Sequence, residues 1–119
     1  MGIKVFGIKN CNTMKKTFQW LEKEGISYEF IDYKKEEPNI DLLKGFLDQA
    51  RLAELINRKG TTFKKLSTEQ KSLLENQDTA LPILAENSSM IKRPLIQFPD
   101  GQLVVGFQEE EILDKAKPK

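Results

Sequence analysis

Residues 3–33 read IKVFGIKNCNTMKKTFQWLEKEGISYEFIDY, and their pattern indicates a strand, a helix and a second strand. The run 3–8 is short, apolar and β-prone, as a buried strand is. Apolar side chains then recur at helical spacing over 13–24, and Gly25 suits the left-handed end of a helix. Residues 28–33 alternate like a half-buried strand. Because crossovers of this length join parallel strands, the stretch predicts a right-handed βαβ unit.

Cys11 is the only cysteine in the chain, and it lies in the loop between the first predicted strand and the helix. Unpaired N–H groups and the helix dipole favour an anion at a helix N-terminus, and the thiolate is the nucleophilic form of cysteine. The loop at the carboxyl end of a parallel strand is also a favoured place for a site. Since a single cysteine can equally fill a core, both interpretations of Cys11 stay open at this point.

The charges of the chain are nearly balanced, because 19 basic and 18 acidic residues give a formal net charge of +1. No overall field would attract nucleic acid or anionic lipid, so direct binding to either is not expected. The sequence contains no histidine, which excludes Cys/His dyads and Ser/His/Asp triads and removes the commonest metal ligand. No metal site is expected, and any chemistry must use the thiol, cations and backbone groups.

The sequence also indicates where in the cell the protein is expected. Its first residues lack the long apolar stretch of a signal peptide, and no segment has the roughly 20 continuous apolar residues of a membrane span. One cysteine cannot form an internal disulfide, and a thiol kept for chemistry needs a reducing compartment. We therefore expect a soluble, cytoplasmic protein.

The middle of the chain, residues 39–87, carries helical periodicity and few β-branched residues. The apolar residues of 52–56 form one helical stripe, and such stripes are expected to pack as core. Another helix is expected to begin with Asp78 or Thr79 as its N-cap. Pro82 would then fall in the first turn, where proline is tolerated.

The last third of the chain returns to β-structure. Runs 95–98 and 103–105 flank the turn 99–102, which predicts a hairpin, and a helix is expected over 108–116. The order of elements is therefore β-α-β, a helical block and β-β-α. It is the order of an α/β, thioredoxin-like fold with an all-helical insertion between an N-terminal βαβ unit and a C-terminal ββα unit.

Four segments carry a resemblance to a known family. They are FGIKNC at 6–11, NRKGTT at 57–62, IKRP at 91–94 and VGF at 105–107. Together they resemble the arsenate reductase (ArsC)/Spx superfamily, and most closely its YffB-like branch. The resemblance covers nearly the whole chain and implies a single ArsC-like domain over 1–119. Its thioredoxin-like core would occupy about 1–38 and 93–119, and its helical insertion about 39–92.

The resemblance also implies a site. Cys11 would be the nucleophile, acting on an oxyanion or a sulfur. Arg58 and Arg93 match two arginines that arsenate reductases use to hold an oxyanion, and a guanidinium fork suits such a group. Further anion-binding residues would come from the loop around the thiol, namely Asn10, Asn12 and Thr13.

Several cations near these motifs have two interpretations. Lys9 and Lys15 flank Cys11 and would lower its pKa, or they are ordinary solvated lysines. Taken without the resemblance, Arg58 could neutralise a helix end, and Arg93 could be a surface cation.

The motifs also contain a proline and two threonines that could belong to the site. Pro94 matches the proline that thioredoxin-like folds place before the third strand, usually in cis, facing the active-site loop. Thr61 and Thr62 could offer hydroxyl groups to an anion, but capping or turn-forming roles are at least as well supported.

Two departures from the family bear on function. The family's Cys-x-x-Cys redox switch would need its second cysteine where this chain has Met14, so an oxidised Cys11 must be resolved by an external thiol. Arsenate reductases of this type place a third arginine after the last strand, where this chain reads Gly106-Phe107-Gln108. An aromatic residue in place of that cation weakens the case for arsenate and leaves room for a glutathionyl or thiol substrate.

We therefore expect a glutathione-dependent thiol reductase. Cys11 would attack a small oxyanion or thiol substrate, and glutathione or a glutaredoxin-like protein would complete turnover. No bound cofactor is expected, and glutathione would be a co-substrate. The alternatives are an arsenate reductase proper and an Spx-like adaptor that regulates transcription by binding RNA polymerase. Spx proteins that sense redox use the cysteine pair that is missing here.

Overall fold

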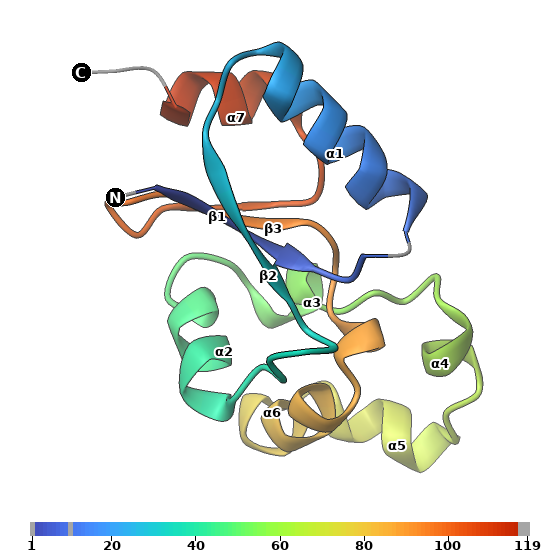
Figure 1. Ribbon diagram of the computed structural model, residues 1–119. Helices are drawn as coiled ribbons and strands as arrows, with labels where there is room; N and C mark the ends of the chain where they lie inside the picture. Colours follow the sequence, from blue (N-terminus) through green and yellow to red (C-terminus); the bar gives the residue numbers. More distant parts are fainter. Residues whose placement is uncertain (1, 10, 117–119) are drawn as a thin grey trace.

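A four-stranded sheet lies at the centre of the protein, whose computed structural model describes residues 2–9 and 11–116 (Figure 1). The strands are β1 (Ile3–Gly7), β2 (Tyr28–Asp32), β3 (Leu95–Gln97) and β4 (Leu103–Val105), in the order β2-β1-β3-β4. β1 and β2 are parallel, whereas β3 is antiparallel to both β1 and β4. The predicted βαβ unit and hairpin are confirmed, and the fold is α/β and thioredoxin-like.

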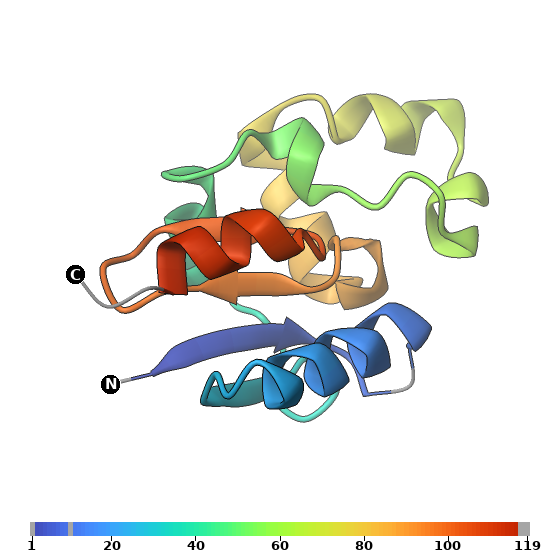
Figure 2. The ribbon, with the colours of Figure 1, turned by 90° about the horizontal axis from the view of Figure 1, so that it is seen from above.

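Two helices, α1 (Asn12–Lys23) and α7 (Glu109–Ala116), cover one face of the sheet (Figures 1 and 2). Alternate strand residues point to this face, since side chains on a strand alternate between the two sides of a sheet. Val5, Ile96 and Val104 pack there with Met14 of α1 and Ile112 of α7. The amphipathic pattern read from the first third of the sequence therefore matches a real buried face.

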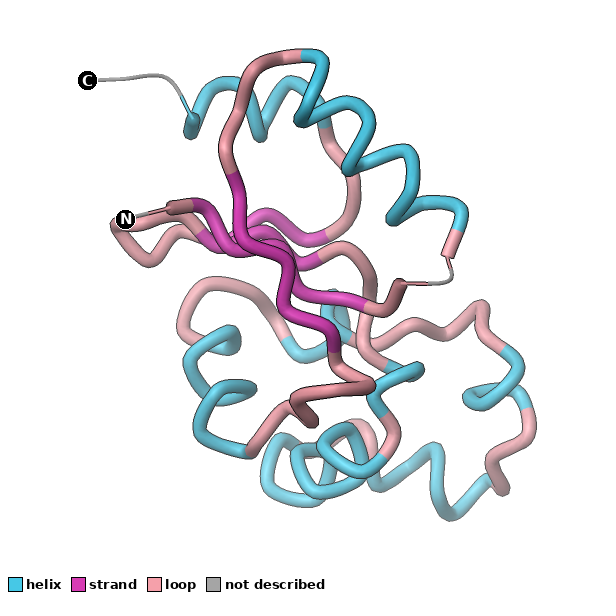
Figure 3. The backbone as a smooth tube through the Cα atoms, in the orientation of Figure 1, coloured by secondary structure: helices cyan, strands magenta, loops and turns pink. Residues whose placement is uncertain are grey.

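The opposite face of the sheet is covered by the helices that lie between β2 and β3 in the chain (Figures 1 and 3). They are α2 (Ile40–Leu47), α3 (Leu52–Leu55), α4 (Thr61–Lys64), α5 (Thr68–Leu73), α6 (Gln77–Glu86) and the 3-10 helix η1 (Ser88–Met90). Phe6, Leu95 and Leu103 of the sheet pack with Phe46 and Leu84 of these helices. The sheet thus separates two hydrophobic cores.

α1 follows β1 in the chain, and Gly25 lies just beyond its C-terminal end, as predicted. Gly25 has a φ of 72°, which L side chains adopt only with strain. At the other end of the helix Met14 is fully buried against Gly7. A Cβ on Gly7 would lie 2.6 Å from the Met14 sulfur, so any larger residue at position 7 would force the buried Met14 side chain to shift.

The prediction that 52–56 form one helical stripe is wrong at its last residue. α3 ends at Leu55, and Ile56 forms an isolated antiparallel bridge with Ile91. The Asn57 N–H donates to the Met90 carbonyl at 2.7 Å, and the Lys92 N–H donates to the Leu55 carbonyl at 2.7 Å. A buried isoleucine suits a helix or a strand, so spacing alone could not place it.

The predicted start of the helix that contains Pro82 is also wrong. α6 begins at Gln77, and its N-cap is Asn76, whose side chain accepts the Asp78 N–H at 2.9 Å. Pro82 consequently lies inside the helix rather than in its first turn. The Thr79 hydroxyl donates to the Leu73 carbonyl in the preceding helix, and so links two helices instead of capping one.

Within residues 2–9 and 11–116, no helix combines the length and the apolar character that crossing a bilayer requires.

Candidate active site

The Cys11 thiol lies at the N-terminus of α1, beyond the carboxyl end of β1. Cys11 is the N-cap residue, with extended backbone angles (φ −147°, ψ 129°), and its carbonyl accepts the Lys15 N–H at 3.0 Å. It is a free cysteine, partly buried against the core beneath α1. The thiol is therefore neither sealed in the core nor fully exposed.

The surroundings of Cys11 favour its thiolate. Partial burial raises the pKa of Cys11, but this effect is outweighed by groups that stabilise the ionised sulfur. These are the Met14 N–H, the Arg93 side chain and the Thr13 N–H as hydrogen-bond donors, together with the positive charge of Arg93. The net result is a pKa below the ordinary value of a cysteine, as expected for a reactive thiol.

Arg93 is held between the helical block and the sheet. It follows the Ile56–Ile91 bridge, and the Arg93–Pro94 peptide bond is cis, as the resemblance implies. The Arg93 Nη1 group donates to the Ser89 carbonyl at 2.9 Å. Its Nε group is buried and has no hydrogen-bond partner among the described residues. The guanidinium therefore has donor capacity to spare beside the sulfur.

Arg58 is placed differently from Arg93. It is exposed, and its guanidinium carbon lies 5.6 Å from the centre of the Phe63 ring, in a cation–π arrangement. Among the described residues, Arg93 shifts the pKa of Cys11 and Arg58 does not. Arg58 nevertheless follows the same bridge, because Asn57 pairs with Met90 while Ile56 pairs with Ile91.

The other residues expected around the thiol have unequal roles. Asn12 is the exposed first residue of α1, and Thr13 contributes its N–H to the stabilisation of the thiolate. Asn10 lies outside the described residues. Lys9 and Lys15 are exposed and are not among the groups that lower the pKa of Cys11. Their interpretation as solvated lysines fits this arrangement.

The positions that depart from the family pattern carry neither a second thiol nor a third arginine. Met14 is fully buried. Phe107 is partly buried and meets Trp20 edge-on, with ring centres 5.6 Å apart. Gln108 turns back to donate to the Val105 carbonyl at 2.8 Å. Neither Phe107 nor Gln108 offers the cation that a third arginine would supply.

Ser89 was not singled out by the sequence, although it links two of the residues that were. Its carbonyl accepts from Arg93, and its hydroxyl lies 3.1 Å from the Thr62 hydroxyl. Thr62 is therefore engaged with a side chain rather than free to bind an anion. No sequence signal in the stretch Asn87-Ser88-Ser89 points to Ser89. Its contribution is a main-chain carbonyl that accepts from Arg93, and every residue has such a carbonyl.

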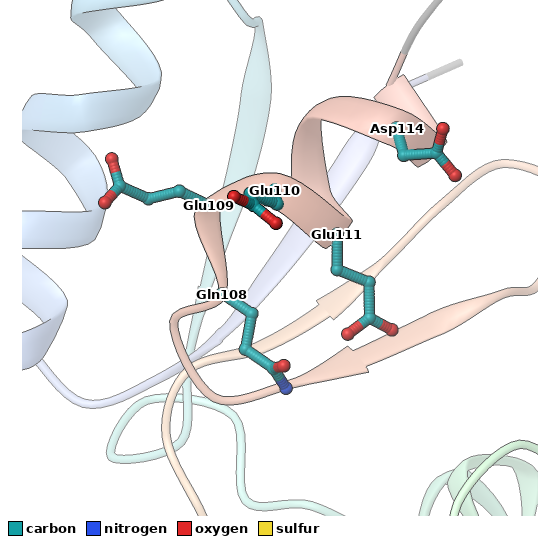
Figure 4. A pocket seen from close by; sticks show the side chains of 5 residues that line it. All are labelled: Gln108, Glu109, Glu110, Glu111 and Asp114. Atoms are coloured by element: carbon teal, nitrogen blue, oxygen red, sulfur yellow. The ribbon is translucent and has the colours of Figure 1, made fainter.

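A depression of about 680 Å³ lies over the start of α7 (Figure 4). It is lined by Gln108, Glu109, Glu110, Glu111 and Asp114. Figure 4 shows these side chains pointing in different directions, and the described residues hold no group of side chains suited to a metal ion. Carboxylates in the first turn of a helix stabilise its positive end, which is a sufficient role for them.

Known proteins resemble this chain along nearly its whole length. Residues 6–115 match the ArsC family. An uncharacterised protein of Haemophilus influenzae is 38% identical over 109 residues, which are 92% of this chain and 94% of that protein.

Solved structures agree with the sequence match. The YffB protein has a TM-score of 0.89 at 33% identity, with 97% of this chain and 99% of that chain covered. An arsenate reductase (ArsC) related protein from Brucella melitensis has a TM-score of 0.76 at 41% identity, with 99% and 97% covered. Because the family match spans β1 to α7, the chain belongs to the ArsC family.

Proposed function

We propose that this protein is a glutathione-dependent thiol reductase that uses Cys11 as its single nucleophile. The observation that carries the proposal is the environment of Cys11, a partly exposed thiol whose pKa is lowered by helix N–H groups and by Arg93. A thiol with these neighbours is ionised over more of the neutral range than a free cysteine, and the thiolate is the attacking species.

The reaction would proceed by two thiol–disulfide exchanges. The Cys11 thiolate attacks the glutathione sulfur of a mixed disulfide, the old sulfur–sulfur bond breaks, and the substrate leaves as a thiolate that takes a proton from water. A second glutathione, having lost its proton, attacks the new disulfide on Cys11. Oxidised glutathione leaves, and the Cys11 thiolate is regenerated. Each turnover consumes one reduced glutathione, whose sulfur ends in oxidised glutathione together with the glutathionyl group of the mixed disulfide, and the substrate is released as a free thiol.

Arg93 would both stabilise the charge of the Cys11 thiolate and position the substrate. Its guanidinium stabilises the Cys11 thiolate when that thiolate is the attacking group and again when it is the leaving group. Its remaining donors could hold a carboxylate of the glutathionyl group, since a guanidinium suits a carboxylate. Arg58, which lies over Phe63, would contribute to the approach of an anion rather than to the thiolate.

Arsenate reduction is the second candidate, because the similar Brucella melitensis protein is described as related to arsenate reductase. Arg93 and Arg58 could receive an oxyanion, and glutathione could again resolve Cys11. The aromatic packing of Phe107 at the place of the third arginine favours the thiol substrate over arsenate.

Turnover assays on the whole protein test the proposal. With glutathione present, the purified protein should reduce a glutathione mixed disulfide faster than it reduces arsenate. Cys11→Ser should abolish turnover, whereas Lys15→Ala, which changes an exposed neighbouring cation, should leave it nearly unchanged. Turnover that survives Cys11→Ser would disprove the mechanism. Capture of RNA polymerase by both wild type and Cys11→Ser, without turnover in either, would favour the adaptor instead.

A further inference from the structure

We propose that Thr62 and Ser89 are positioning residues for Arg93, and that their paired hydroxyl groups keep the Ser89 carbonyl where it holds the guanidinium beside Cys11. The inference rests on the proposed function only in assuming that the Cys11 thiolate matters for activity. Its geometric core is a chain of contacts that leads from α4 through η1 to the thiol.

The Ser89 carbonyl is available to Arg93 because of the bridge beside it. In η1 the Met90 N–H donates to the Asn87 carbonyl, and the Ile91 N–H donates to the Ser88 carbonyl. A further 3-10 turn would place the Lys92 N–H on the Ser89 carbonyl. The Lys92 N–H instead donates across the bridge to the Leu55 carbonyl at 2.7 Å. The Ser89 carbonyl therefore accepts from Arg93 Nη1, at 2.9 Å.

The Thr62–Ser89 contact closes the loop that carries Arg58. That loop begins at Asn57, which is paired with Met90, and it ends in α4, where Thr62 Oγ1 lies 3.1 Å from Ser89 Oγ. η1 is only three residues long, so it has little rigidity of its own. The hydroxyl pair therefore gives η1 a second attachment to the helical block, in addition to the bridge.

Apart from its interaction with the Cys11 sulfur, one hydrogen bond orients the Arg93 guanidinium within the described part of the chain. Nη1 bonds to Ser89, whereas the buried Nε has no partner. If η1 shifts, the long arginine side chain loses this anchor and can turn away from the sulfur. Because Lys9, Lys15 and Arg58 do not act on Cys11, no other described side-chain charge would replace it.

The test measures the pH dependence of Cys11 alkylation by iodoacetamide in the whole protein. Thr62→Val keeps the shape of the side chain and removes its hydroxyl, while Thr62→Ser is the matched control that keeps the hydroxyl. Thr62→Val should raise the apparent pKa and slow alkylation at pH 7 by about three- to tenfold, which corresponds to about half to one pKa unit. Thr62→Ser should remain close to wild type.

Double variants show whether the effect runs through Arg93. Ser89→Ala should reproduce Thr62→Val, and combining the two should add little, because both remove the same hydrogen bond. In an Arg93→Ala background, Thr62→Val should change nothing further. An unchanged profile in Thr62→Val would overturn the inference, and so would an equal shift in the Arg93→Ala background.

The same measurements separate this inference from the proposed function. Alkylation needs no turnover, so the coupling of Thr62 to Cys11 can hold in a protein that fails to reduce a mixed disulfide. Conversely, turnover with an unchanged alkylation profile in Thr62→Val would support the function and reject the positioning role. Thermal unfolding of each variant identifies any that fail to fold, and the Thr62→Ser and Ser89→Ala comparisons keep the inference testable in that case.

Discussion

The Met14 side chain fills the space above Gly7, so that a Cβ at position 7 would lie 2.6 Å from its sulfur. This contact joins the end of β1 to the first turn of α1, and Cys11 lies between the two. The residue that stands in place of a second cysteine therefore also joins the strand and the helix on either side of the thiol.

Gly7→Ala should destabilise the protein by about 1–3 kcal/mol, because the added methyl group overpacks a fully buried contact. The measurement is urea unfolding at equilibrium. Gly45→Ala is the matched control, since position 45 lies inside α2 with open space around it and carries no positive φ. It should stabilise by about 0.5–1 kcal/mol. Equal effects at the two positions would contradict the role given to the Gly7–Met14 contact.

Met14→Cys should convert the protein from a one-cysteine to a two-cysteine mechanism. After treatment with oxidised glutathione, wild type should carry one glutathione on Cys11, because the sequence offers no second thiol. In Met14→Cys the new thiol should displace the glutathione and form a disulfide with Cys11. Intact-mass analysis distinguishes the two products.

Met14→Ala is the control for lost packing at this position. It should keep the glutathione adduct, and like Met14→Cys it should lose stability, by about 2–5 kcal/mol for the alanine variant. A persistent adduct in a folded Met14→Cys protein would show that the two positions cannot exchange.

Alkylation of Cys11 should rise through an apparent pKa below the roughly 8.5 of a free cysteine. The sign follows from the folded state, which favours the thiolate, so reactivity is present above the lowered pKa and is lost as the pH falls through it. Arg93→Ala should move the curve to higher pH, because it removes both a donor and a positive charge. Arg58→Ala should leave the curve in place. An equal displacement in both variants would contradict the distinction drawn between the two arginines.

The lowered pKa of Cys11 also predicts how the free energy of unfolding depends on pH. Because the folded pKa of Cys11 is depressed, its contribution to stability is fully present above the unfolded pKa and declines toward lower pH. Comparing wild type with Cys11→Ser by urea unfolding at several pH values should therefore show a difference that favours wild type increasingly as the pH rises into the alkaline range. A difference that grew toward acid would contradict a lowered pKa.

Phe107→Arg should raise kcat/KM for arsenate, because it supplies a cation at the place where related reductases have a third arginine. It should also cost about 1 kcal/mol or more of stability through the lost contact with Trp20. Phe107→Leu removes the aromatic contact without adding charge, and it should not improve arsenate reduction. If both variants gained equally, access rather than charge would limit arsenate.

Local patterns accounted for most of the fold. The strands of the βαβ unit, the Gly25 helix end and the hairpin each depend on periodicity or on turn residues within a short stretch, and all are present. The Ile56–Ile91 bridge was missed because pairing between distant segments leaves no local pattern. The start of α6 was misplaced because Asn76, Asp78 and Thr79 are all good capping residues, and only the geometry selects Asn76.

Some residues of the candidate site could also be predicted from the sequence, and others could not. Cys11 could be singled out from its position before a helix, and the arginines from the resemblance. The difference between Arg93 and Arg58 could not be foreseen, because it depends on which guanidinium reaches the thiol in space. The role of Ser89 could not be foreseen either, because its main-chain carbonyl exists in every residue and becomes informative only when a partner is seen.

The Cys11–Arg93 relationship also has a consequence during synthesis. The thiol lies in the first helical connection and the guanidinium just before β3, so a ribosome makes them far apart in time. A nascent chain carries Cys11 without the guanidinium until the segment before β3 has emerged and docked, since long-range contacts form after local ones. The thiol would thus gain its full acidity only as the fold closes, which would limit its oxidation while the chain is still incomplete.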